Sequence, residues 1–188
     1  MNDFLIHYGI KGQKWGIRRF QNPDGSLTQE GKRRYRSINY LPDDKIFISG
    51  KVSFDKKLTP SMKKEIDSII KAKSKILIGD APGADTTVQK YLASKKYDNV
   101  EVFTTDQIVR NNVGNWNVRK IESSVKDDER TIRRQKDIAM TKESTRGLAI
   151  MPINDRPDSA MSLNINRLIQ QNKLTKIFDY EQNKEFFK

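Results

Sequence analysis

The sequence contains no cysteine and a single histidine, His7, among its 188 residues. The absence of cysteine excludes disulfide bonds, thiolate zinc sites and cysteine nucleophiles. With one histidine, neither the usual histidine-based metal sites nor a Ser-His-Asp triad can be built in a straightforward way. Much standard enzymology is therefore excluded, and we expect no metal and no other cofactor.

Hydrophobic residues are also scarce, at 35% of the chain against 32% charged residues. No apolar run approaches the roughly twenty residues that a helix needs to cross a bilayer. The first residues, MNDFLIHYGIKGQKWG, lack the basic-then-apolar order of a signal peptide. We therefore expect a soluble, unexported protein without a membrane partner, long enough for one domain and an appendage.

The formal net charge of +12 favours polyanions, nucleotides or an acidic protein as partners. The lysines are scattered, however, and often stand beside acidic residues, as in KKEIDS and KDDERTIRRQKD. This pattern is more typical of solvated helix faces than of one basic stripe. Sequence-unspecific DNA binding remains an alternative that rests on the charge alone.

Short apolar runs alternate with helical patterns from Lys45 onward. The runs are KIFIS, KILIG, VEVF, GLAIMP and TKIFDY, and Thr59 and Pro60 mark the start of the first helix between them. Such alternation predicts a parallel sheet covered on both faces, which is an α/β, Rossmann-like three-layer sandwich. We divide the chain into a basic and aromatic N-terminal segment (1–44), this domain (45–180) and a charged tail (181–188).

Two of the expected helices are defined by the spacing of their apolar residues. The stretch from about Asn117 to Lys142 fits one broken or two consecutive amphipathic helices. Its apolar positions are Val118, Ile121, Val125, Ile132, Ile138 and Ala139. The helix after the fourth strand is expected to bury Ala160, Leu163 and Leu168.

Three loops end strands where open parallel sheets bind ligands, beyond the carboxyl ends of the strands. The first is Ser49, Gly50 and Lys51, and the third is the polar segment INDRPDS, which contains Asn154, Asp155 and Ser159. The polar side chains of this third loop precede a helix, and such a setting can bind an anion. An ordinary loop with Ser159 as the helix N-cap is an equally good interpretation.

The second loop, GDAPGAD, is the most informative. Gly79 and Gly83 permit tight turns and a close approach of a phosphate or ribose, and Pro82 stiffens the turn. We expect Asp85 to cap the following helix and Asp80 to contact the ligand. Ala81 completes the predicted ligand-binding loop. The loop contains neither the dinucleotide motif GxGxxG nor the phosphate loop GxxxxGK[ST].

The order KIFISG, helix, KILIGDAPGADTTVQKYL, VEVF resembles the SLOG superfamily of Rossmann-like proteins. That group includes the lonely-guy phosphoribohydrolases and DNA-processing protein A. Its small-residue loop of the type SGGARGAD, which lies beside the nucleotide, is matched by Gly79–Asp85. The lonely-guy motif PGGxGTxxE, whose glutamate takes part in glycosidic cleavage, has no counterpart in MPINDRPDSAMSLN. The resemblance therefore implies nucleotide binding and leaves hydrolysis unsupported.

The segment GNWNVR is a second candidate wall of the pocket. Asn115 lies in it, Trp116 is suited to stack on a base and Arg119 to meet a phosphate, although a tryptophan is more often a core residue. Arg110, Arg133 and Arg134 are further possible phosphate partners. For Arg133 and Arg134 a solvated helix face is the better interpretation.

The segment from His7 to Tyr35, HYGIKGQKWGIRRFQNPDGSLTQEGKRRY, resembles an element that recurs in unrelated phage proteins encoded near head genes. That element reads HxGxKGMKWGxRRyQNPDGSLTxxGxxRY, and Gln13 replaces its methionine. The resemblance implies a phage origin and location in the host cytoplasm or the virion. Trp15 with its basic neighbours would suit docking on a phage head protein or another acidic surface.

Our first hypothesis is a phage-encoded protein that sequesters a nucleotide, an NAD-derived or cyclic immune signal of the host, without turnover. A nucleoside-phosphate glycosidase that uses Asp80, Asp85 or Asp155 is the second, ranked lower, so the sequence leans against an enzyme. The third is a structural or cargo protein of the virion. By analogy with the family we also expect self-association.

Overall fold

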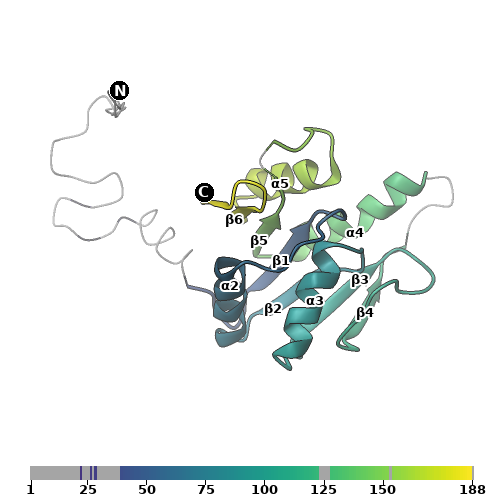
Figure 1. The fold of residues 1–188 in the computed structure, drawn as a ribbon, viewed down its shortest axis with the longest axis horizontal. Helices are drawn as coiled ribbons and strands as arrows, with labels where there is room; N and C mark the ends of the chain where they lie inside the picture. The colour runs from purple at the N-terminus through teal and green to yellow at the C-terminus, as the bar shows by residue number, and fades with distance from the viewer. Residues whose placement is uncertain are drawn as a thin grey trace. The chain divides into compact units, whose positions relative to one another are not determined.

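The structure is a computed structural model, and it describes residues 22, 26, 28, 39–122, 128–152 and 154–187. The chain divides into two units, residues 1–39 and 40–188. In the first unit the backbone N–H of Asn22 donates to the carbonyl oxygen of Ser26 at 2.7 Å, and the Asn22 amide donates to the Ser26 hydroxyl at 2.9 Å. The second unit contains the helices and strands labelled in Figure 1.

One seven-stranded sheet forms the middle of the second unit, in the order β4-β3-β2-β1-β5-β6-β7. Its strands are β1 (Lys45–Gly50), β2 (Lys75–Gly79), β3 (Val100–Thr104), β4 (Asn117–Lys120), β5 (Arg146–Ile150), β6 (Leu174–Asp179) and β7 (Lys184–Phe187). All pairs are parallel except β6 and β7. The predicted α/β, Rossmann-like sandwich with a mainly parallel sheet is confirmed.

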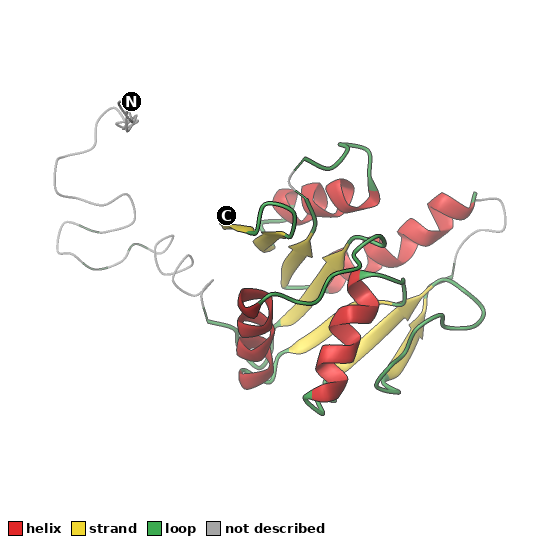
Figure 2. Cartoon of the chain, viewed as in Figure 1, coloured by secondary structure: helices red, strands yellow, loops and turns green. Residues whose placement is uncertain are grey.

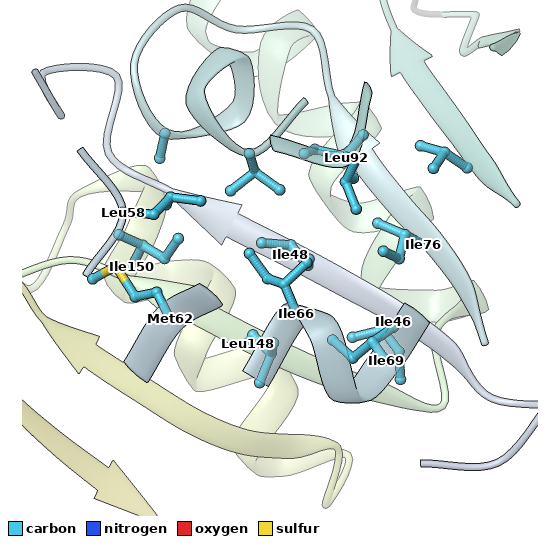
Figure 3. Close-up of a cluster of buried hydrophobic side chains, with 14 of the residues drawn as sticks. Ile46, Ile48, Leu58, Met62, Ile66, Ile69, Ile76, Leu92, Leu148 and Ile150 are labelled. Carbon is cyan, nitrogen blue, oxygen red and sulfur yellow. The ribbon is translucent and has the colours of Figure 1, made fainter. Parts of the chain in front are cut away.

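Four helices cover the two faces of the sheet, as Figure 2 shows. They are α2 (Pro60–Lys71), α3 (Ala84–Ser94), α4 (Glu129–Glu143) and α5 (Ala160–Gln170). Alternate residues of each strand point to opposite faces. Ile46 and Ile48 therefore pack with α2 and α3 in the cluster of Figure 3, whereas Phe47 packs with Met140 of α4. Thr59 caps α2 by accepting from the Met62 N–H, as predicted.

The stretch from Asn117 to Lys142 differs from the prediction. Residues 117–120 form the edge strand β4, and the helix α4 begins only at Glu129. Val118 and Ile138 are 38% and 40% exposed, so neither belongs to a buried helix face. The buried face of α4 instead contains Lys136, which is 5% exposed. Val125 lies outside the described residues.

The last helix and the tail also depart in part from the sequence pattern. Leu168 is fully buried, but Ala160 is exposed and the polar Asn164 lies in the inner face of α5. Four residues of the charged tail, Lys184–Phe187, add the antiparallel edge strand β7. Within the described part of the chain, no helix is both long and apolar enough to cross a membrane.

The sheet contains a switch point between β1 and β5. From β1 the chain proceeds through β2 and β3 to β4 on one side, and it then returns to continue with β5 on the other side of β1. Loops after adjacent strands diverge at such a point and leave a crevice at the carboxyl ends of the strands. The topology therefore places the ends of β1 and β5 where a ligand site is expected.

Candidate functional site

A cavity of about 860 Å³ lies at this switch point. Its wall combines residues that follow β1, β2 and β5 with residues of α4 and α5. Sites for small molecules commonly have volumes of about 300–1,000 Å³. The predicted residues that line the cavity are Ser49, Gly50, Lys51, Ala81, Pro82, Asp85, Asp155 and Ser159.

The loops after β1 and β2 pack directly on each other. Gly83 has a φ of +81°, and a Cβ there would lie 2.2 Å from the carbonyl oxygen of Val52. Only glycine fits this backbone conformation and this close approach. The first N–H of α3, that of Ala84, donates to the carbonyl oxygen of Lys51 at 3.0 Å. Part of the start of α3 is thus bonded within the protein rather than turned toward a ligand.

Asp80 was expected to contact the ligand, but the structure places it beneath the cavity wall. Its side chain is fully buried and accepts from Lys136 at 2.6 Å, from Arg110 at 2.7 Å and from the Thr104 hydroxyl at 2.8 Å. Burial would raise the pKa of Asp80, but the hydrogen bonds from Arg110 and the charge of Lys136 outweigh it and hold the pKa well below its usual value. Asp80 therefore orients two cations that line the cavity.

Asp85, rather than Asp80, lines the cavity. The N-cap of α3 is Gly83, without a side-chain cap bond, so the prediction that Asp85 caps the helix is wrong. Its carboxylate accepts weakly from the Ala81 N–H at 3.3 Å and lines the cavity. A Cβ on Gly79 would lie 2.4 Å from Asp85 Oδ2, so glycine makes room for this carboxyl group.

The protonation of Asp85 is unusual. Burial raises the pKa of Asp85 to about 7, against the opposing charge of Lys136, and the neighbouring Asp137 raises it further. Burial also raises the pKa of Asp137. The cavity wall therefore contains two carboxyl groups whose pKa values are raised above the ordinary value of aspartate.

The loop before α5 forms the opposite wall. Asp155 accepts from the Lys51 ammonium at 2.5 Å and from the Ser159 hydroxyl at 2.6 Å. Ser159 accepts from the Ser162 N–H and is the N-cap of α5, so it caps the helix and lines the cavity as well. Asn154 is exposed and does not line the cavity.

The segment around Trp116 does not form a wall of this cavity. Trp116 is packed in the core, and its indole N–H donates to the carbonyl oxygen of Tyr97 at 2.8 Å. Asn115 is an exposed turn residue with a φ of +53°. Arg119 forms ion pairs with Glu101 and Glu143 and lies over the Phe103 ring. All three residues therefore have structural roles away from the cavity.

Helix α4 supplies the part of the site that sequence reasoning missed. Lys136, Asp137 and Met140 line the cavity, as do Arg133 and Arg134, which were expected on a solvated face. The sequence does place Lys136, Asp137 and Met140 on one face of the helix, because they are spaced by three and four residues. An apolar pattern could not reveal this face, because it contains charged residues.

Asn164 of α5 is the second missed residue. Its amide donates to Asp137 at 2.9 Å and to the Ser49 hydroxyl at 3.1 Å, and its oxygen accepts from Arg167 at 2.7 Å. One buried amide on the cavity wall thus connects α4, β1 and α5. Asn164 fixes the orientation of the Asp137 carboxyl group.

A family model described as "Family of unknown function (DUF7211)" matches residues 1–22. The match covers part of the N-terminal segment and none of the α/β domain. No curated protein matches the chain.

One arginine nitrogen on the cavity wall is available to a hydrogen-bond acceptor. The Nε of Arg134 is buried and has no hydrogen-bond partner among the described residues. A buried guanidinium N–H without an acceptor is costly, and an anionic ligand would supply the acceptor. In the described ranges there is no group of three His, Cys, Asp or Glu side chains that could hold a metal ion.

Asp80→Asn should destabilise the fold at neutral pH by about 3–5 kcal/mol, because Lys136 would remain buried without its counter-charge. Urea unfolding measures this loss. Asp98→Asn, at an exposed position, is the control and should change the stability little. An Asp80→Asn protein as stable as the wild type would show that the ion pair is unimportant.

Asp85→Asn should change the pH dependence of stability. With a folded pKa of about 7 and an ordinary unfolded value of 3.8, the folded state binds the extra proton between these limits. The Asp85 contribution to wild-type stability therefore falls as the pH rises through this window. At about pH 8 we expect Asp85→Asn to be more stable than the wild type by about 2–4 kcal/mol, and at about pH 4 the difference should vanish. Urea titrations at both pH values measure the difference in unfolding free energy between variant and wild type. Equal differences at the two pH values would contradict the raised pKa of Asp85.

Proposed function

We propose that the cavity binds a nucleotide-type ligand and retains it without chemical change. The observation that carries this proposal is the unpartnered Nε of Arg134 on the wall of a cavity at the sheet switch point. The wall also offers carboxyl groups and apolar surface, so it suits a ligand with an anionic end, hydroxyl groups and a flat apolar part.

The anionic end of the ligand is assigned to the side of α4 and α5. Arg133 and Arg134 line this side together with Ala160 and Met161 in the first turn of α5. The first N–H groups of a helix have no acceptor within the helix and attract negative charge. A guanidinium beside such a helix start is a favourable setting for a phosphate group.

The rest of the cavity suits a sugar and a base. The carboxyl groups of Asp85 and Asp137 accept hydrogen bonds from hydroxyl groups when ionised and donate one when protonated. Phe47, Met140 and Met161 provide apolar surface for a base. A ribose between these two regions would be in contact with both.

The biological setting follows from the N-terminal segment. Its resemblance to a phage-type element motivates a phage protein that removes a nucleotide signal, NAD-derived or cyclic, from host defence. Sequestration needs tight binding and no catalytic group. Docking of the segment on a head protein, with the domain as virion cargo, is compatible with this role.

Asp85 supports a second candidate function, a nucleoside-phosphate glycosidase. A carboxyl group with a pKa near the working pH is suited to general acid catalysis, and Asp85 has a raised pKa on the cavity wall. The other two carboxylates considered for this role fit it less well. Asp80 is buried under ion pairs, and Asp155 is paired with Lys51.

Arg134→Ala should weaken binding of a nucleotide by about 10-fold to 100-fold, the value of a charged hydrogen bond. Calorimetry with adenosine monophosphate, NAD, ADP-ribose and a cyclic dinucleotide would measure the affinities. Arg156→Ala removes the same charge from a side chain that is 77% exposed and should bind as the wild type does. If no nucleotide binds the wild type, or if both variants bind equally, the assignment fails.

Incubation with the same nucleotides, followed by denaturation and chromatography, separates the two candidate functions. We expect the wild-type protein to return the nucleotide intact. Free base together with the matching sugar phosphate, such as adenine and ribose phosphate from adenosine monophosphate, would instead establish the glycosidase if they appear with the wild type but not with Asp85→Asn.

A further inference from the structure

Helices α2 and α3 lie side by side on one face of the sheet (Figure 1). Between them is a shallow hollow of about 420 Å³ whose wall includes Lys63, Lys64, Asp67, Lys71 and Tyr91. It shares no residue with the wall of the larger cavity. Any ligand of this hollow is therefore separate from the proposed nucleotide.

Positive charge dominates the hollow. Of the described residues that line it, Asp67 alone is acidic, and its carboxylate already accepts from the Tyr91 hydroxyl at 2.9 Å and from Lys95 at 3.0 Å. Lys64 and Lys71 form no ion pair with any residue that the structure describes. The hollow thus has more ammonium groups than carboxylates to neutralise them.

Glu185, a further acid near Lys64, does not cancel this charge. Glu185 of β7 lies within electrostatic reach of Lys64, but its carboxylate is paired with Lys176 at 3.2 Å. The ammonium groups of Lys63 and Lys95 lie 5.9 Å and 5.1 Å from the centre of the Tyr91 ring. The Tyr91 ring is therefore in contact with two lysine side chains instead of presenting an open aromatic face.

The spacing of the lysines suits a chain of phosphates. Lys64 and Lys71 are two helical turns apart, which is about 10 Å along the axis of α2. Ammonium groups at this separation can each neutralise a different phosphate of one nucleic-acid backbone. Lys63 adds a third ammonium group beside this line, whereas Lys95 is paired with Asp67.

We propose that this α2–α3 lysine hollow, lined by Lys63, Lys64 and Lys71, binds the phosphate backbone of nucleic acid without reading its sequence. Lysine acts as a point charge and makes no paired contact with a base edge. An acidic membrane is the poorer fit, because membrane-binding faces insert large apolar side chains. None of the exposed large hydrophobic residues among those described lines the hollow.

The test is binding of a short DNA duplex and of single-stranded DNA by the full chain, measured by fluorescence anisotropy over a range of salt concentrations. The variant Lys63→Ala/Lys64→Ala/Lys71→Ala should lose about tenfold or more in affinity at low salt. The slope of log affinity against log salt should become shallower by about 2–3, roughly one for each lysine removed.

The control is Lys57→Ala/Lys120→Ala/Lys142→Ala, which removes the same charge from three exposed lysines that do not line the hollow. It should bind almost as the wild type does. Absence of DNA binding by the wild type, or equal losses in both variants, would overturn the proposal. So would preferential binding of phosphatidylserine vesicles that the first variant abolishes.

Discussion

The site depends on one buried ion cluster, in which Asp80 accepts from Lys136 and Arg110. Asp80 directly follows β2, Arg110 belongs to the connection between β3 and β4, and Lys136 belongs to α4. One carboxylate therefore holds together three segments that are distant in the sequence. Burying an unpaired ammonium costs several kcal/mol, so the ionised Asp80 stabilises Lys136 at the cavity wall.

The same cluster explains the division of roles between two neighbouring aspartates. Asp80 is surrounded by donors, so its pKa is lowered although burial opposes this. Asp85 is also near the charge of Lys136, but among the described residues it accepts one weak hydrogen bond, from a backbone N–H, and burial raises its pKa. The sequence places both carboxyl groups in one loop, and it contains no sign of which one the distant Lys136 and Arg110 approach. That is why the sequence did not predict that Asp80 is buried in an ion cluster and that Asp85 lines the cavity.

The sheet was predictable because its central strands are short apolar runs, such as KILIG, whose alternate residues are buried on both faces. The edge strands were not. β4 has exposed side chains along most of its length, and β7 lies in a charged tail, so neither shows an apolar run. The inner faces of α4 and α5 were missed for a related reason. Lys136 and Asn164 occupy core-facing positions there, because their polar atoms are bonded within the site.

The start of α3 was expected to attract the anion, by analogy with other Rossmann-like sheets. The close packing of Gly83 on the loop after β1 changes this, because the carbonyl oxygens of Lys51 and Val52 lie against it and Lys51 accepts from the Ala84 N–H. Carbonyl oxygens at this position repel an anion. Asp85 in the first turn of α3 adds a carboxyl group there. Negative charge on a ligand is thus disfavoured beside α3 and favoured beside Arg133 and Arg134. The two ends of the cavity therefore differ in the charge that they accept. A nucleotide bound in it would have its phosphate toward α4 and α5 and its hydroxyl groups toward α3.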